Sequence, residues 1–295
     1  MKLPYMDAHC DTLSRCLNTG ESLLKTSGQC DLTRLAAYEP WGQMFAIFHD
    51  SADVPPEGLF GRVRRMYEYF CRERTAHPER MRGAMLSIEG GELLECSPRR
   101  LEEIRNWGVR SINLTWNHAN AISGSHREDP DRGLSSAGRE FVRKSQSMGI
   151  LIDVSHLSDP GFWDLAEITK LPLFASHSNS RAVCGHTRNL TDDQFRAIRD
   201  SGGVVGINLF RVFVGGDRME DVLAHFDHFL ELEGESTLAL GSDWDGDIVG
   251  AGGIRGVEGM HLLAEAMARH GYGERLIRSI FYDNLARLLG LSPSI

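Results

Sequence analysis

Short apolar runs alternate with amphipathic runs along the chain, and this alternation limits the fold more than any other feature. Eight runs have the apolar and β-branched residues of buried strands, at 5–9, 42–49, 83–89, 109–115, 150–155, 172–176, 203–208 and 237–242. Runs with helical periodicity lie at 59–76, 98–106, 135–148, 159–169, 191–201, 219–234, 257–270, 273–281 and 283–289. Strands that alternate with helices indicate βαβ units and a parallel sheet.

The number of these units indicates how the sheet is closed. About eight units in 295 residues predict a (β/α)₈ barrel that forms a single domain over residues 1–295. A doubly wound open sheet is the alternative. Its dinucleotide-binding form is not supported, because no GxGxxG motif opens a helix after the first strand.

Charge and cysteine usage exclude several classes of protein. The net charge is −9, whereas nucleic-acid-binding domains present a basic face. No stretch approaches the ~18 apolar residues of a membrane span, and the first residues lack the apolar segment of a signal peptide. None of the six cysteines forms a CxxC pair or a disulfide framework. We therefore expect a cytoplasmic protein with reduced thiols and with neither nucleic-acid nor membrane partners.

Potential metal ligands and acids lie where the predicted strands end. Functional side chains of (β/α)₈ barrels gather at the carboxyl ends of the strands. The residues in such positions are His9, Asp11, Glu89, His156, His177 and Asp243. Each histidine alone would more often be a hydrogen-bonded core residue, but the whole set on one predicted rim indicates a metal site.

The first strand ends in an HxD pair. In an extended segment His9 and Asp11 point to the same side, so both can bind one metal ion. A hydrogen-bonded pair at the strand end is the alternative interpretation. Asp7 has the same parity but lies deeper in the strand, and we assign it no role.

A pair of metal ions needs a bridging anion to offset their mutual repulsion. Many barrel hydrolases use a carboxylated lysine, but none of the four lysines lies at a predicted strand end. Glu89 in the segment SIEGG is placed to bridge instead, and Gly90 and Gly91 allow a tight turn beside it. The alternative is a glutamate paired with a core arginine.

The remaining candidates supply neutral ligands and a proton acceptor. His156 and His177 offer imidazoles, and a set of His, carboxylate and water ligands suits Zn²⁺ or a similar ion. Asp243 in LGSDWDG can accept a proton from a metal-bound water. Asp245, two residues further on, is the weaker candidate.

In these segments the chain resembles the membrane (renal) dipeptidases, peptidase family M19, over nearly its whole length. The segments that carry the resemblance are DAHCDT, SIEGG, DVSH, SHS, GHTRN, GSDWDG and YDNLARLLG. The resemblance implies a (β/α)₈ barrel with two Zn²⁺ per chain. It also implies hydrolysis of dipeptides, with a hydroxide that bridges the metals as the nucleophile.

The resemblance implies a role for each matched residue. One Zn²⁺ would be held by His9, Asp11 and Glu89, and the other by Glu89, His156 and His177. Asp243 would carry the proton to the leaving amine. Arg188 would bind the C-terminal carboxylate of the dipeptide, for which a guanidinium is a fork-shaped match. A structural salt bridge is the alternative for Arg188.

The chain departs from the family pattern after the fourth predicted strand. The family has Thr-His there, and the histidine contacts the reacting carbonyl, whereas this chain reads LTWNHAN. Trp116 stands in place of that histidine, and His118 follows two residues later. We expect Trp116 to line the pocket against a substrate side chain. The alternative is that His118 contacts the carbonyl oxygen.

Two other functions remain open at this stage. One is a different binuclear metal amidohydrolase on the same barrel, such as an amidase, lactonase or deaminase. The other is a metal-binding protein that has lost catalysis, which Trp116 favours. Activity on dipeptides with a free carboxylate distinguishes the first, and turnover with bound zinc excludes the second. For assembly we consider a homodimer.

Overall fold

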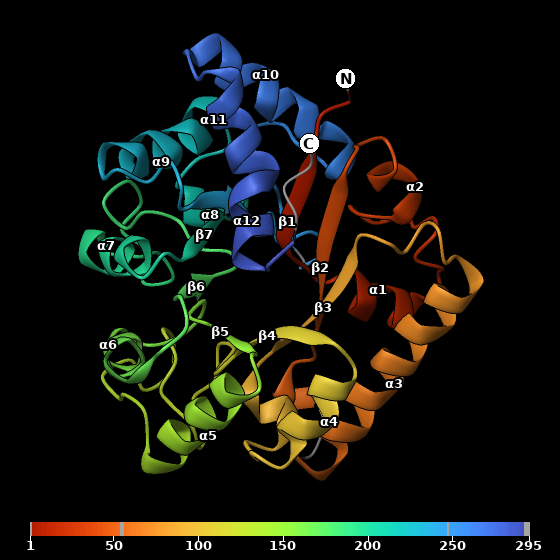
Figure 1. The fold of residues 1–295 in the computed structure, drawn as a ribbon, viewed down its shortest axis with the longest axis vertical. Helices are drawn as coiled ribbons and strands as arrows, with labels where there is room; N and C mark the ends of the chain where they lie inside the picture. Colours follow the sequence, from red (N-terminus) through yellow and green to blue (C-terminus); the bar gives the residue numbers. More distant parts are fainter. Residues whose placement is uncertain (1, 54–55, 247, 292–295) are drawn as a thin grey trace.

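The strands form a closed parallel barrel in the order β1 to β8 (Figure 1). The computed structural model describes residues 2–53, 56–246 and 248–291. The strands are β1 (Tyr5–Cys10), β2 (Trp41–Ile47), β3 (Ala84–Glu89), β4 (Val109–Asn113), β5 (Leu151–Asp153), β6 (Phe174–Ala175), β7 (Val204–Ile207) and β8 (Leu238–Leu240). The predicted (β/α)₈ barrel is confirmed, and an open sheet is excluded by the pairing of β1 with β8.

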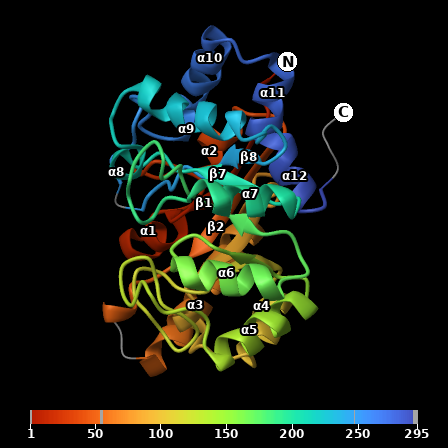
Figure 2. The ribbon, with the colours of Figure 1, turned by 90° about the vertical axis from the view of Figure 1, so that its left-hand side faces the viewer.

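Helices surround the strands (Figures 1 and 2). They are α1 (Thr12–Thr19), α2 (Leu32–Leu35), α3 (Pro56–Ala76), α4 (Arg100–Asn106), α5 (Ser136–Ser147), α6 (Asp159–Ile168), α7 (Asp192–Asp200), α8 (Arg211–Val214), α9 (Met219–Glu231), α10 (Met260–His270), α11 (Glu274–Arg278) and α12 (Asn284–Leu288). Shorter turns are η1 (Ser51–Asp53), η2 (Gly91–Leu94) and η3 (Val257–Gly259), and η4 (Ser279–Asp283) is a π-helix. Among the described residues, none of these helices combines the length and apolar content that crossing a membrane requires.

Polar residues in the sequence fix where several helices begin. Ser135 accepts a hydrogen bond from the backbone N–H of Gly138, and Ser158 does the same for Gly161. Thr191 forms a capping box with Gln194. Such caps satisfy N–H groups that have no partner inside the helix, so they set the register of α5, α6 and α7.

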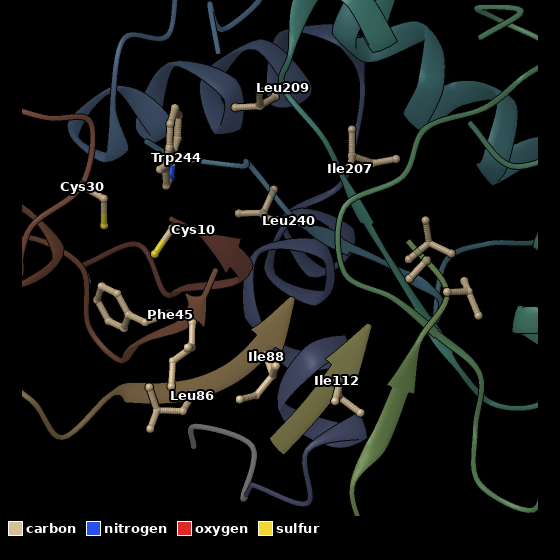
Figure 3. Packing of buried hydrophobic residues seen from close by; sticks show 14 of the residues in the cluster. Cys10, Cys30, Phe45, Leu86, Ile88, Ile112, Ile207, Leu209, Leu240 and Trp244 are labelled. Atoms are coloured by element: carbon tan, nitrogen blue, oxygen red, sulfur yellow. The ribbon is translucent and has the colours of Figure 1, made fainter. Parts of the chain in front are cut away.

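The core has two parts, one of them in the layer between strands and helices. Figure 3 shows side chains of this layer, among them Phe45, Ile88 and Ile112 from three neighbouring strands. A second cluster takes residues from most of the strands and covers them with residues of η4 and α12. Its buried members are Met6, Ala8, Met44, Leu151, Phe174, Val204, Ala239, Tyr282, Leu285, Ala286 and Leu289. The C-terminal helical segment therefore packs against the barrel strands themselves.

Candidate metal centre

The end of β1 carries His9 and Asp11 into the centre of the barrel rim. Asp11 is fixed by its backbone N–H, which donates to the carbonyl of Trp244 across 2.7 Å, so β1 is held to the segment that follows β8. The backbone N–H of His9 donates to Asp7 Oδ1 at 2.9 Å, which fixes the position of His9. Both side chains are buried.

Asp7, to which we assigned no role, accepts hydrogen bonds that hold the end of β1 in place. Its carboxylate accepts the backbone N–H and the hydroxyl of Ser242, the hydroxyl of Tyr5 at 3.1 Å and the amide of Gln43 at 3.3 Å. One buried carboxylate therefore joins the first strand to the segment after the last.

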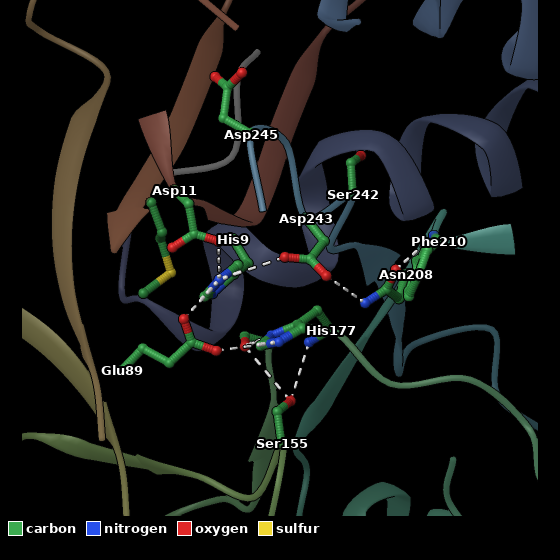
Figure 4. Close-up of polar contacts among 12 residues, drawn as sticks. His9, Asp11, Glu89, Ser155, His177, Asn208, Phe210, Ser242, Asp243 and Asp245 are labelled. Carbon is green, nitrogen blue, oxygen red and sulfur yellow. Dashed lines mark hydrogen bonds and ion pairs between the residues drawn. The ribbon is translucent and has the colours of Figure 1, made fainter. Parts of the chain in front are cut away.

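The carboxylate of Glu89 faces both His9 and His177 (Figure 4). Its Oε2 is 3.3 Å from Nε2 of His9. Its Oε1 is 3.0 Å from Nε2 of His156 and 3.5 Å from Nε2 of His177. Each carboxylate oxygen thus faces a different side of the site, which is the position that a bridging carboxylate requires.

The nitrogen and oxygen atoms around Glu89 are arranged as ligands of divalent cations would be, and they do not satisfy one another by hydrogen bonding. Nε2 of His156 and Nε2 of His177 lie only 3.0 Å apart, and the His9 and His177 rings stack with centroids 3.9 Å apart. His9 Nε2 and Asp11 Oδ1 are buried without a hydrogen-bond partner among the described residues. Buried polar atoms normally have partners, so this convergence indicates that cations satisfy them.

The electrostatics of the site treat its histidines differently: the carboxylates of Glu89 and Asp11 outweigh burial and raise the pKa of His9 well above its usual range, whereas His156 and His177 are kept neutral. Burial, assisted by the charge of Arg188, holds the pKa of His156 well below its usual range, and burial together with His9 does the same for His177. Neutral imidazole is the form that binds metals. Burial raises the pKa of Glu89 to about 7, although His9 opposes the change. A bound cation would remove this penalty on the charged carboxylate.

Asp243 lies on the side of the site opposite Glu89. Its backbone has a φ of 66°, and its side chain lies beside the candidate metal ligands, with Oδ1 3.8 Å from His9 Nε2. Burial raises its pKa to about 6. A carboxylate with such a pKa can both accept and release a proton near neutral pH.

Asp245 has a different environment. Its Oδ2 accepts the hydroxyl of Thr12 at 2.7 Å, and its Oδ1 accepts the backbone N–H of Gln29 at 2.7 Å. Figure 4 shows its side chain turned away from His9 and Asp243. Asp245 therefore ties the β8 loop to neighbouring segments.

A cavity of about 620 Å³ opens over the predicted ligands. Glu89, His156, Asp11 and Asp243 form part of its lining. Trp116 lines it and packs against Phe48, with ring centroids 4.9 Å apart. Other aromatic residues of the lining, Phe210 and Phe213, contact each other at 4.9 Å. The cavity thus has a charged floor and partly aromatic walls.

His118 is turned toward the rim. Its Nδ1 lies 3.2 Å from Glu128 Oε2 and its Nε2 lies 3.4 Å from Asp50 Oδ1. Both ring nitrogens therefore face surface carboxylates, and the ring joins two loops at the mouth of the cavity.

Arg188 is buried near the candidate metal ligands. Its Nη1 donates to Ser178 Oγ at 2.8 Å, while Nε and Nη2 have no hydrogen-bond partner among the described residues. Burial lowers its pKa to about 10, and the charge of Asp243 opposes this change. The guanidinium remains charged at neutral pH and has two donor nitrogens left for an anion.

Two polar residues of the site, Asn208 and Asn117, were not predicted from the sequence. Asn208 follows β7 directly and donates its side-chain amide to Asp243 Oδ2. Asn117 follows Trp116 and contacts His156 through its side-chain oxygen. The rule that strand ends carry functional residues could have found Asn208, since the predicted strand 203–208 ends on it. Asn117 had no signal, because its role depends on a loop conformation.

Together, the fold and the site define a metal-dependent hydrolase on a (β/α)₈ barrel. Residues 71–291 match the model of the family described as membrane dipeptidase, peptidase family M19. The chain therefore belongs to the membrane dipeptidase family, and it is a dipeptidase of the metallopeptidase class.

Individual relatives agree with this assignment. The chain is 36% identical over 278 residues to an uncharacterised protein in the PQQ-III 3′ region of Acinetobacter calcoaceticus. The alignment covers 78% of this chain and 87% of that protein. A crystal structure of a metallopeptidase from Rhodobacter sphaeroides, liganded with a phosphinate mimic of L-Ala-D-Ala, has 28% identity and a TM-score of 0.86, and covers 98% of this chain and 99% of its own. The dipeptidase AC of family M19 has 30% identity, a TM-score of 0.86 and 98% coverage of both chains.

Proposed function

We propose that the protein is a dipeptidase with two Zn²⁺ per chain bridged by Glu89. The position of Glu89, with one oxygen toward His9 and the other toward His156 and His177, carries this proposal. His9 and Asp11 complete the first site, and His156 and His177 complete the second. When bound, the two ions would polarise the scissile carbonyl and lower the pKa of an attacking water.

Asp243 is the group that moves the proton in this proposal. Its Oδ1 lies 3.8 Å from His9 Nε2, beside the proposed first site, where a carboxylate can take a proton from the attacking water. The protonated carboxyl can then release that proton to the nitrogen of the leaving amino acid, which cannot depart as an amide anion. Asn208 keeps Oδ2 occupied, so Oδ1 is the oxygen that exchanges the proton.

Arg188 and Trp116 are assigned to the substrate. Arg188 has two unpartnered donor nitrogens, which a C-terminal carboxylate can fill with charge-assisted hydrogen bonds. Trp116 forms an apolar wall with Phe48, against which a substrate side chain can pack. His118, the alternative, is engaged by Asp50 and Glu128, and we give it no contact with the reacting carbonyl.

The experiment that tests this function combines metal counting with a dipeptide library. Protein stripped of metal and reloaded with Zn²⁺ should contain two ions per chain and hydrolyse dipeptides with a free carboxylate. One ion or none in folded protein contradicts the binuclear centre. Two ions without turnover on any dipeptide would instead support a protein that has lost catalysis.

Assembly and location form a separate part of the proposal. All six cysteines are free thiols in the structure, which is compatible with a reducing compartment, and we place the protein in the cytoplasm. We also propose a homodimer. Cell fractionation tests the first statement, and light scattering, which gives the mass of the particle in solution, tests the second.

A further inference from the structure

Two histidines from different loops share one oxygen atom of Asn117. His156 Nδ1 lies 3.0 Å from Asn117 Oδ1, and His126 Nε2 lies 2.9 Å from the same atom. Asn117 follows Trp116 in the loop after β4 and lines the cavity. His156 is one of the five candidate metal ligands, so its contact with Asn117 bears directly on the metal centre.

Metal binding by His156 fixes the direction of these hydrogen bonds. A histidine that binds metal through Nε2 must carry its proton on Nδ1. That proton needs an acceptor, and the side-chain oxygen of Asn117 can only accept. The His126 nitrogen that faces the same oxygen must therefore also be a donor, which leaves His126 Nδ1 to accept the hydroxyl of Thr187 at 3.2 Å.

The opposite arrangement is incompatible with the site. If the amide group of Asn117 faced His156, it would donate to Nδ1, and the proton of a neutral ring would move to Nε2. A protonated Nε2 would point at Glu89 Oε1, 3.0 Å away, and could not bind a cation. The orientation of one side-chain amide thus decides whether His156 is a ligand.

We propose that Asn117 is a positioning residue of the metal centre, which holds the proton on His156 Nδ1 and keeps Nε2 free for the ion shared with Glu89 and His177. The inference rests on the proposed binuclear centre. Asn117 acts only through His156 and needs no contact with the ion. Through His126 and Thr187, the same hydrogen bonds reach the residue that precedes Arg188.

Asn120 offers a matched control in the same loop. Its side-chain nitrogen donates to Glu92 Oε2 at 2.6 Å and to the carbonyl of Leu114 at 2.8 Å. Its side-chain oxygen accepts the N–H of Ile122 at 2.8 Å. Substituting Asn120 removes interactions that shape the loop but leaves the acceptor of His156 in place.

The test measures the affinity of each metal site by competition with a chelator of known strength. Mutating an outer partner of a metal ligand typically costs about 10- to 100-fold in metal affinity. We therefore expect Asn117→Ala to bind one Zn²⁺ about 10- to 100-fold more weakly and to keep the other at wild-type affinity. Asn117→Asp retains an acceptor oxygen and should restore the affinity to within about threefold of wild type. Asn120→Ala should lower thermal stability without selective loss of one ion.

Several results would overturn the inference. Asn117→Ala with both ions at wild-type affinity would show that His156 needs no acceptor there. Equal losses in Asn117→Ala and Asn117→Asp would show that the shape of the residue matters and its oxygen does not. If Asn117→Ala does not fold, the pair Asn117→Ser and Asn117→Asp decides, because only the aspartate keeps an acceptor at that reach. Wild-type protein with no bound metal would contradict the proposed function itself.

Discussion

Asn208 donates its side-chain amide to Oδ2 of Asp243 across 3.0 Å, which leaves Oδ1 turned toward His9. One oxygen of the proposed proton carrier is thereby held in place, and the other is left for chemistry. The hydrogen bond also favours the charged carboxylate and so opposes the rise in pKa that burial causes. Asn208 therefore orients Asp243 and helps to keep its pKa near neutrality.

Replacing Asp243 with asparagine should abolish most of the turnover and leave the metals bound. An amide cannot take up the proton of the attacking water, and general acid–base catalysis is typically worth ~10²–10⁴-fold in rate. Steady-state kinetics and metal analysis of Asp243→Asn check this. The control is Asp245→Asn, which removes a structural carboxylate from the same loop and should reduce stability more than kcat. Activity of Asp243→Asn within a few-fold of wild type would assign proton transfer to another group.

Removing the metal should destabilise the protein without unfolding it. A ligand that binds only the folded state stabilises it by RT ln(1 + [L]/Kd), which is about 2.7 kcal/mol for one site at 100 times Kd. Zn²⁺ should therefore raise the melting temperature of stripped protein in a concentration-dependent way. Glu89→Gln should show a much smaller rise, because the proposed bridging ligand has lost its charge. An equal rise in both proteins would place the ions elsewhere.

Arg188→Met should raise KM for dipeptides strongly. A hydrogen bond to a charged group contributes about 1.5–3 kcal/mol, which corresponds to roughly 10- to 150-fold in affinity. The control uses dipeptides with an amidated C-terminus. These should be poor substrates of the wild type and should not respond to the substitution. If the wild type cleaves amides as well as acids, Arg188 does not bind the carboxylate.

The loop after β4 gives a prediction about Trp116 and His118. His118→Ala should lower kcat by less than tenfold, because its ring nitrogens face Asp50 and Glu128. Trp116→Ala should change KM and side-chain preference, since it removes the apolar wall shared with Phe48. A dipeptide series that varies one side chain at a time measures both effects. A hundredfold loss of kcat in His118→Ala, with both metals retained, would make His118 catalytic.

Glu92 makes the stability of the protein depend on pH. Burial raises its pKa from 4.5 to about 7, so folding favours the neutral carboxyl. This contribution is complete below pH 4.5 and is lost as the pH rises through 7. Its size is at most about 3 kcal/mol, because a change of one in pKa corresponds to about 1.4 kcal/mol.

The comparison of wild type with Glu92→Gln isolates this effect. The variant carries no charge at any pH, so its free energy of unfolding relative to wild type should increase between pH 5 and pH 8. Urea denaturation of metal-free protein at both values measures the difference. A difference that does not change with pH would show that Glu92 titrates normally.

The sequence predicted the barrel because each strand carries its own apolar pattern. It missed α1, α2 and α8. Of these, α2 and α8 have four residues each and are too short to show helical periodicity. It also divided the last helical segment into 273–281 and 283–289, whereas α11, η4 and α12 follow one another without a break. A π-helical turn has no separate sequence signal.

The residue at which a strand ends was harder to predict for the strands that are followed by site residues. Predicted strands 150–155, 172–176 and 237–242 shrink to three, two and three residues in β5, β6 and β8. After β5 and β8 the backbone turns within a few residues, as the positive φ of His156 and Asp243 shows. The apolar pattern predicts which residues are buried, but it does not predict where strand pairing ends. The candidate ligands could be predicted from the sequence, but the contacts among Asn117, His126 and His156 could not, because they depend on tertiary packing.

Asp7, which joins β1 to the segment after β8, has a consequence for how the protein acquires its metals. Until Ser242 has been synthesised, Asp7 lacks the partner that holds the two ends of the barrel together. His9 and Asp243 therefore meet only in a nearly complete chain. The large apolar core can form without ions, unlike that of a zinc finger. A cell short of metal would accordingly accumulate folded, inactive enzyme, and activity would return on resupply without new protein synthesis.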